Sequence, residues 1–274
     1  MSLPDTFQFT QAKLQDYDDC PRRFQLRYVL MQPWPALITG QPGEYDRHVA
    51  RGRDFHRLAH QYTLGLDPGR LEETIHDPIL LQWWKTFLEN PPAGLPTALR
   101  RAEVVVAAPL GGYRLMARFD LLAAEPGERL VLVDWKTVLK PTPRSVLSRR
   151  LQTRVYRYLA VEAGAAFNGG RPPQPHQIEM VYWFAPSGGR TESFPYDAEQ
   201  HAAGRQSLVD LIAEIAAHRG ATWPLTPDER RCRFCNYRSL CEREVKPGFL
   251  EDLEEDLDAP ELEIDLEQIT EIEF

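Results

Sequence analysis

Two acids and a lysine near the middle of the chain have the types and spacing that divalent-metal chemistry requires. Asp120 lies in one apolar run, and Asp134 and Lys136 lie in the next, with a Glu-Pro-Gly-Glu turn at 125–128 between them. A Pro-Gly turn between apolar runs predicts a β-hairpin. Alternation along a strand turns Asp134 and Lys136 to the same face. Such a group can hold a hard cation and activate water beside a phosphate.

The cysteines form a second group with metal-binding spacing. Cys232, Cys235 and Cys241 make a C-x2-C-x5-C run, and Cys20 lies far upstream. Three thiolates at short spacing indicate a metal centre, but the spacing does not separate zinc from an iron–sulfur cluster. Four unrelated buried cysteines are the alternative. If Cys20 joins the same centre, the two chain ends are tied together and residues 1–248 form one domain.

Other candidate residues have a functional and a plain interpretation. His56 and His60 are four apart on a predicted helix and share a face, although a lone helix histidine is more often a surface or core residue. Glu103 could support the metal ligands, but a surface acid is the more frequent role. Arg22, Arg23 and Arg27 could face phosphate or simply be solvated. Phe24, Phe234 and Tyr237 could stack on bases, although core packing is expected at least for Phe24.

A sheet with helices around it is needed to position these residues. Hydrophobic patterns, caps and breakers predict helices at 10–20, from Pro21, at 48–64, 77–89, 148–163 and 197–218. They predict strands at 103–107, 113–122, 129–135, 177–186 and 190–196. This order is that of an α/β or α+β sandwich with a central mixed sheet.

Composition bounds the class of protein. The chain has 274 residues, 43% hydrophobic and 26% charged, as in ordinary globular proteins. We find no apolar stretch long enough for a transmembrane helix and no secretory signal, so no membrane association and a cytoplasmic location are expected, with reduced cysteines. The sequence lacks a G-x4-G-K-[ST] loop, so it carries no helicase motor.

The net charge of −8 hides an uneven distribution. Residues 251–274 hold 12 of the 40 acids and no Lys or Arg, so residues 1–250 carry 32 bases against 28 acids, a net of +4. A mildly basic body is compatible with nucleic acid. The acidic tail, 249–274, is either a disordered solubilising segment or an added strand, because Leu262, Ile264 and Leu266 alternate with acids. In the second case it could cover a basic DNA groove or dock a partner.

Six motifs together resemble the RecB-like branch of the PD-(D/E)XK nuclease superfamily that carries an iron–sulfur cluster. This branch includes AddB-type helicase–nuclease subunits and RecB-like nucleases of CRISPR systems. The resemblance covers most of residues 10–245. In chain order the motifs are Tyr17-x2-Cys20-Pro-Arg-Arg-Phe24, Gly52-x3-His56, Asp120, Asp134-Trp135-Lys136, Gln152-x3-Tyr156 and the C-x2-C-x5-C run. Each motif is weak alone, but their shared order is specific. Phe119 stands where the family name has proline.

The resemblance implies a restriction-endonuclease-like core, with a metal-cluster region joining the N- and C-terminal segments. It implies Mg²⁺ or Mn²⁺ on His56, Asp120, Asp134 and the Trp135 carbonyl. Lys136 would orient water or stabilise the transition state, and Gln152 and Tyr156 would position Lys136 or contact the DNA backbone. It further implies a [4Fe-4S] cluster on Cys20, Cys232, Cys235 and Cys241, with zinc as the alternative.

The function expected from this resemblance is a metal-dependent DNA nuclease, most simply an exonuclease acting on single strands or ends. It would serve DNA repair, recombination or CRISPR adaptation with a helicase or another partner. The alternative is an iron–sulfur-stabilised DNA-binding module of a larger complex, with weak or no catalysis.

Overall fold

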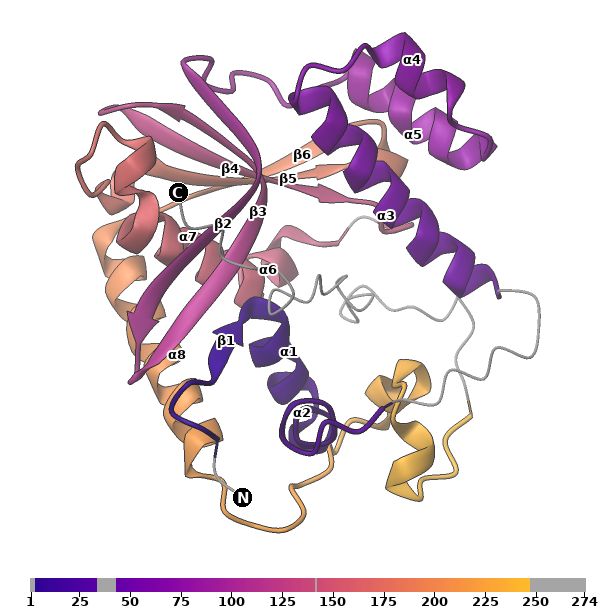
Figure 1. Cartoon of the computed structure of the whole chain (residues 1–274), viewed down its shortest axis with the longest axis vertical. Coiled ribbons are helices and arrows are strands. Elements are labelled where there is room, and N and C mark those ends of the chain that lie inside the picture. Colours follow the sequence, from indigo (N-terminus) through magenta and orange to yellow (C-terminus); the bar gives the residue numbers. More distant parts are fainter. Residues whose placement is uncertain (1–2, 34–42, 141, 247–274) are drawn as a thin grey trace.

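A six-stranded mixed sheet forms the centre of the protein (Figure 1). The computed structural model describes residues 3–33, 43–140 and 142–246. The strands are β1 (Gln8–Thr10), β2 (Leu99–Leu110), β3 (Tyr113–Glu125), β4 (Arg129–Lys136), β5 (Ile178–Phe184) and β6 (Arg190–Pro195). β2 pairs with β3 along one edge of β3. Along the opposite edge of β3, β1 pairs with its first half and β4 with its last residues. The β1–β3 and β4–β5 pairs are parallel, and the remaining pairs are antiparallel.

Helices cover both faces of this sheet. They are α1 (Gln11–Asp19), α2 (Pro21–Phe24), α3 (Glu44–Thr63), α4 (Pro68–Glu73), α5 (Pro78–Glu89), α6 (Arg144–Leu147), α7 (Leu151–Ala163) and α8 (Ala198–Ala217). A π-helical turn, Gln25–Val29, follows α2. Short 3₁₀ turns include Glu229–Phe234, which contains Cys232 and is followed by Cys235, and Arg238–Cys241, which ends at Cys241. No described helix is long and apolar enough to cross a membrane.

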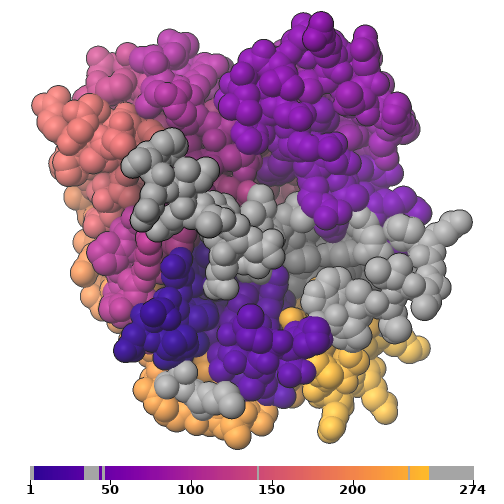
Figure 2. Space-filling view, viewed as in Figure 1, coloured from indigo at the N-terminus to yellow at the C-terminus, as the bar shows by residue number. Residues whose placement is uncertain are grey.

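The C-terminal segment returns to the N-terminal helices. Phe24 stacks on Trp223 with centroids 5.6 Å apart, and the Arg22 N–H donates to the Pro224 carbonyl at 3.0 Å. In Figure 2 this segment, in orange and yellow, lies beneath the indigo and violet helices. These contacts join the two ends of the body, whereas their connection through a shared metal centre stays a prediction. The boundary between a domain of residues 1–248 and a tail stays a prediction, since 247–274 lie outside the described residues.

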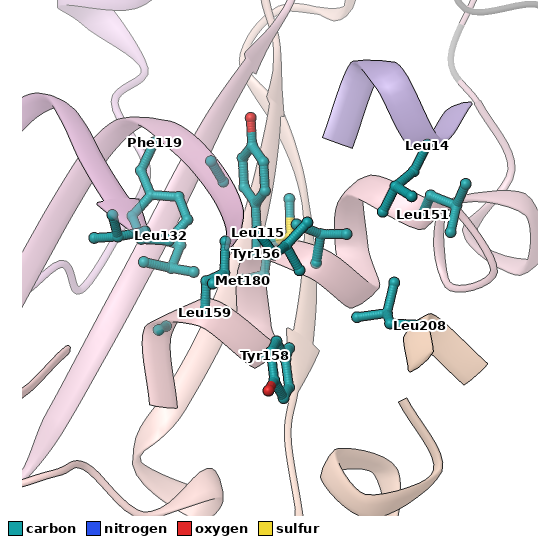
Figure 3. Packing of buried hydrophobic residues seen from close by; sticks show 14 of the residues in the cluster. Leu14, Leu115, Phe119, Leu132, Leu151, Tyr156, Tyr158, Leu159, Met180 and Leu208 are labelled. Atoms are coloured by element: carbon teal, nitrogen blue, oxygen red, sulfur yellow. The ribbon is translucent and has the colours of Figure 1, made fainter. Parts of the chain in front are cut away.

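The sheet separates two hydrophobic cores. β4 alternates between them, with Leu130 and Leu132 in one cluster and Val131 and Val133 in the other. Such a strand is apolar throughout because both of its faces are covered. In Figure 3, α7 places side chains such as Leu159 against Leu132 and its neighbours on the sheet. The second core is aromatic and is formed by α3 and α5 against the opposite face, with Trp84, Phe87 and Trp183 among its members.

Most predicted elements are confirmed, including the mixed central sheet and the three-stranded meander. Thr10, Asp77 and Asp197 cap their helices through side-chain hydrogen bonds. Three details differ. The helix predicted at 48–64 begins at Glu44, and the one predicted at 148–163 begins at Leu151 because Arg150 has an extended backbone, ψ 142°, with α6 as a separate helix before it. β1 and α4 were not predicted.

Candidate functional site

The two acids of the hairpin face each other across β3 and β4. The register pairs Leu121 with Val133, so Asp120 and Asp134 stand opposite at the next position. Both side chains are buried. Asp120 Oδ2 accepts a hydrogen bond from the Trp135 backbone N–H at 2.8 Å, which fixes its orientation against β4. The sheet therefore places two carboxylates together where the β3–β4 pairing ends.

Gln152, at the start of α7, connects Asp134 with Lys136. Its Nε2 donates to Asp134 Oδ1 at 2.7 Å, and its Oε1 accepts from Lys136 Nζ at 2.9 Å. Lys136 Nζ also lies 3.1 Å from Asp134 Oδ2. The ring of Tyr182 lies under this ammonium, 5.5 Å from Nζ to the centroid. Tyr156 is one turn along α7, with its hydroxyl 3.4 Å from Gln152 Nε2. The predicted catalytic residues thus form one connected group.

His56 lies on α3 and reaches Asp120 from that helix. Phe55 stacks on Trp183 with centroids 5.7 Å apart and an interplanar angle of 4°, which anchors the helix on the sheet. Gly52 allows close approach, because a Cβ there would lie 3.0 Å from Thr137 Oγ1. His56 Nδ1 consequently lies 3.3 Å from Asp120 Oδ1.

Glu103 on β2 completes a group of metal-ligating atoms. Atoms of His56, Glu103 and Asp120 lie within 4.8 Å of one another, and among the described residues this group includes neither His60 nor Asp134. Glu103 has a left-handed backbone, φ 53°, and lies 3.0 Å from Arg118. The pairs Ala102–Leu121 and Val104–Phe119 set Glu103 opposite Asp120. This register is a tertiary feature, so local sequence patterns favoured the role of a surface acid for Glu103.

Electrostatics follows from burial and from the close charges. Burial would lower the pKa of His56, but the Asp120 carboxylate outweighs burial and raises it to about 9. Burial would raise the pKa of Asp120, whereas His56 and the Trp135 N–H hold it below its usual value. Burial raises the pKa of Asp134 to about 6 against the opposing effect of Lys136. The chain alone thus holds an imidazolium–carboxylate pair where a cation would fit.

The donor set suits a hard divalent cation. Carboxylate oxygens with one imidazole are ligands of Mg²⁺ and Mn²⁺, with the nitrogen favouring Mn²⁺. Trp135 contributes its backbone N–H to Asp120, and its indole packs on Phe87 at 5.2 Å. The participation of its carbonyl and of Asp134 in binding the cation stays a prediction.

The four cysteines line one pocket, between the end of α1 and the C-terminal 3₁₀ turns. Cys20 and Cys232 are buried, and Arg243 Nη1 donates to Cys232 Sγ at 3.6 Å. Burial raises the pKa of Cys235 to about 11, so this thiol keeps its proton at neutral pH unless a metal replaces it.

The residues predicted to contact DNA also have partners within the protein. Arg22 donates to Gln25 Oε1 at 2.5 Å, Arg23 pairs with Asp16 at 2.7 Å, and Arg27 pairs with Asp16 at 3.1 Å. Their contact with DNA stays a prediction. Phe24 is core, as expected.

Of the other two aromatic candidates, Tyr237 is buried and its hydroxyl donates to the Gln32 carbonyl at 3.2 Å. The side chain of Phe234 is outside the described part.

Comparison with known proteins agrees with this geometry. A sequence model of the PD-(D/E)XK nuclease superfamily matches residues 8–242, an interval that contains the acids, His56 and all four cysteines. The crystal structure of a "Putative exonuclease" from Eubacterium rectale is 9% identical, covers 90% of this chain and 92% of that chain, and gives a TM-score of 0.50, which is a likeness of fold. The crystal structure of SSO0001 is 12% identical over 90% of each chain, but its TM-score of 0.38 carries no argument. No curated protein matches the chain significantly.

Proposed function

The chain belongs to the PD-(D/E)XK nuclease superfamily, and we propose that it is a metal-dependent deoxyribonuclease of the RecB-like branch. The substrate is single-stranded DNA or DNA ends, and the reaction is hydrolysis of a phosphodiester bond by exonucleolytic cleavage. The observation that carries this proposal is the convergence of His56, Asp120 and Asp134 with Lys136 and Gln152, from two strands and two helices.

The metal site would use His56 and Asp120, with Asp134, the Trp135 carbonyl and Glu103 as the remaining candidate ligands. Bound there, Mg²⁺ or Mn²⁺ would lower the pKa of a water and neutralise charge on the scissile phosphate. The Trp135 N–H keeps one oxygen of Asp120 directed at β4 and leaves the other facing His56. The site is thus oriented before the cation arrives, which favours binding.

Lys136 would act on the phosphate or on the attacking water. Its ammonium is held by Asp134, by Gln152 and over the Tyr182 ring, so a positive charge is fixed where negative charge develops. Gln152 is a positioning residue, because it binds Asp134 and Lys136 at once. Tyr156 packs on Phe119 with centroids 5.1 Å apart and places its hydroxyl beside Gln152.

Cleavage of labelled single-stranded DNA with Mn²⁺ tests the proposal. Asp120→Asn and Asp134→Asn should each abolish product, while His60→Ala should cleave like wild type. Linear and circular single strands separate exonuclease from endonuclease action. Equal cleavage by Asp134→Asn would contradict the proposal. Tight DNA binding by wild type without cleavage would favour the binding module instead.

The cysteine pocket is proposed to hold a [4Fe-4S] cluster on Cys20, Cys232, Cys235 and Cys241. The meeting of all four cysteines, from both ends of the chain, in one pocket supports a shared centre. Freshly purified protein should be brown, absorb near about 400 nm and contain iron and sulfide. Stoichiometric zinc without iron would establish the alternative.

The biological setting follows from the resemblance alone. DNA repair, recombination or CRISPR adaptation are the processes in which a RecB-like nuclease would act in the cytoplasm, and a separate helicase would supply strand separation. Co-purification of the native full-length chain with its partners tests this.

A further inference from the structure

Arg23, on α2, lies between two carboxylates and the cysteine pocket. Its Nη2 pairs with Asp16 Oδ1 at 2.7 Å and with Asp19 Oδ2 at 2.5 Å, and its side chain is only 18% exposed. Its Nε is buried and has no hydrogen-bond partner within the described part of the chain. A buried donor left unpaired is costly, so an acceptor that occupies the pocket would satisfy it.

The pocket that Arg23 lines is rich in arginine. Arg231, Arg238 and Arg243 line it together with Arg23 and the four cysteines, and none of its described lining residues is acidic. Arg243 comes from the C-terminal end of the described chain, and its Nη1 lies 3.6 Å from Cys232 Sγ. These arginines bring positive charge close to any anionic centre that the cysteines bind, and Arg23 and Arg231 are also paired with acids outside the pocket lining.

We propose that Arg23 and Arg243 form a cationic clamp on the cysteine centre, one from each end of the chain. Arg23 offers its unpaired Nε–H to a sulfur of the centre and is held in place by Asp16 and Asp19. Arg243 donates to Cys232 from the C-terminal side. Four thiolates on one divalent ion or on one [4Fe-4S]²⁺ core give a formal charge of about −2. Arg243 brings a positive charge toward it, whereas the charge of Arg23 is already paired with Asp16 and Asp19, so Arg23 contributes mainly its N–H.

The clamp would have two measurable consequences. Mutation of a residue that hydrogen bonds to a metal ligand typically lowers metal affinity about 10- to 100-fold. Hydrogen bonds to the sulfurs and nearby positive charge favour the reduced, more negative form of a cluster, so the clamp would raise its reduction potential. The inference rests on the cysteine centre of the proposed function and does not involve the residues around Asp120.

Cobalt binding by the full-length, metal-stripped protein tests the clamp. Co²⁺ alone is titrated, and thiolate-to-cobalt charge-transfer absorption reports the affinity of the cysteines. Arg23→Lys keeps a charge for Asp16 and Asp19 but removes the Nε donor, and Arg243→Gln alters a half-buried residue outside the two cores. Each should weaken binding about tenfold. Arg230→Gln, which removes an exposed partner of Asp228 that does not line the pocket, should not.

The readouts separate the failure modes. Circular dichroism verifies that each variant is folded. If Arg23→Lys does not fold, the cobalt affinity of Arg243→Gln alone tests the clamp. Wild-type affinity in both variants would overturn the clamp and leave the centre intact. Wild type without any thiolate–cobalt absorption would overturn the centre and the clamp together, while DNA cleavage, measured in parallel, reports on the nuclease separately. Where purified protein holds iron, both variants should show a lowered midpoint potential.

Discussion

At the scale of single residues, Glu103 has a closer relation to the candidate metal site than the surface role that the sequence favoured. It lies with His56 and Asp120 inside 4.8 Å and has a left-handed backbone that non-glycine residues rarely adopt. In the absence of a cation its carboxylate pairs with Arg118. If Glu103 is a metal ligand, its carboxylate should leave Arg118 and bind the cation. If its role is purely structural, the Glu103–Arg118 ion pair should persist when the cation binds.

Glu103→Gln distinguishes these roles. The amide removes a charge without removing volume, so the Mn²⁺ concentration for half-maximal cleavage should rise about tenfold. Cleavage at saturating Mn²⁺ should recover most of its rate. Glu125→Gln, at the far end of β3, is the matched control and should leave the metal dependence unchanged. An unaltered Mn²⁺ requirement in Glu103→Gln would assign Glu103 to Arg118 alone.

At the scale of elements, the approach of α3 to β4 sets the position of His56. Gly52→Ala would put a methyl group 3.0 Å from Thr137 Oγ1, and a β-branched side chain moves only with difficulty. We expect a loss of about 1–3 kcal/mol in the free energy of unfolding, measured in urea, and weaker cleavage as His56 shifts. Thr137→Ala in the same chain should restore both. If Thr137→Ala restored neither stability nor cleavage, the contact between residue 52 and Thr137 would not be the cause of the losses.

The cap of α5 gives a prediction that depends on pH. Asp77 accepts from Ile79 N at 2.9 Å and Leu80 N at 3.1 Å, and pairs with Arg51 at 2.6 Å. Burial would raise its pKa, but Arg51 and the two N–H groups outweigh burial and lower it. Because the pKa of Asp77 is lower in the folded than in the unfolded state, its ionised carboxylate stabilises the fold at any pH above the pKa of the unfolded state. This stabilisation is lost as the pH falls through the pKa of the folded state.

Asp77→Ala should accordingly lower the free energy of unfolding by about 1 kcal/mol near neutral pH. The deficit should begin to shrink as pH falls below about 4, where the unfolded carboxylate takes up its proton, and should be smallest below the lowered pKa of the folded state. Asp77→Asn retains a capping oxygen without the charge, so its deficit should be smaller near neutral pH and should also shrink at low pH, because the titrating group is in the wild type. Urea unfolding at several pH values measures all three. A deficit of Asp77→Ala that is independent of pH would exclude the charge as its source.

Local patterns explain which elements and site residues the sequence predicted. The hairpin that carries Asp120, Asp134 and Lys136 depends on a turn and on alternation, both of which are local. β1 has three residues and exists because it pairs with β3, and the α6–α7 break depends on the backbone of Arg150. Sequence spacing did not reveal these features, nor the position of Glu103, because tertiary pairing creates them.

At the scale of the molecule, Gln25 ties the two ends of the body together. It is buried, donates to the Ala221 carbonyl at 2.9 Å and accepts from the Trp223 N–H at 2.9 Å. Gln25→Ala leaves both backbone groups unpaired, so we expect a loss of about 1–3 kcal/mol in urea unfolding. Gln206→Ala, which removes an exposed contact with Asp210, is the control. Equal stability of the two variants would show that Trp223 and Phe24 suffice for the connection.

The charge distribution over the whole chain leads to the last prediction. Residues 251–274 bring 12 acids to a body of net +4. A chain ending at 250 should bind single-stranded DNA more tightly than the full chain at low salt, because an acidic segment competes with phosphate for the basic body. Near 1 M salt, where the Debye length is about 3 Å, the difference should vanish.

A full-length chain with these acids changed to Asn and Gln should match the shortened one. If it binds like wild type instead, the tail acts through its apolar residues or its length, and if truncation leaves low-salt affinity unchanged, the tail does not compete with DNA.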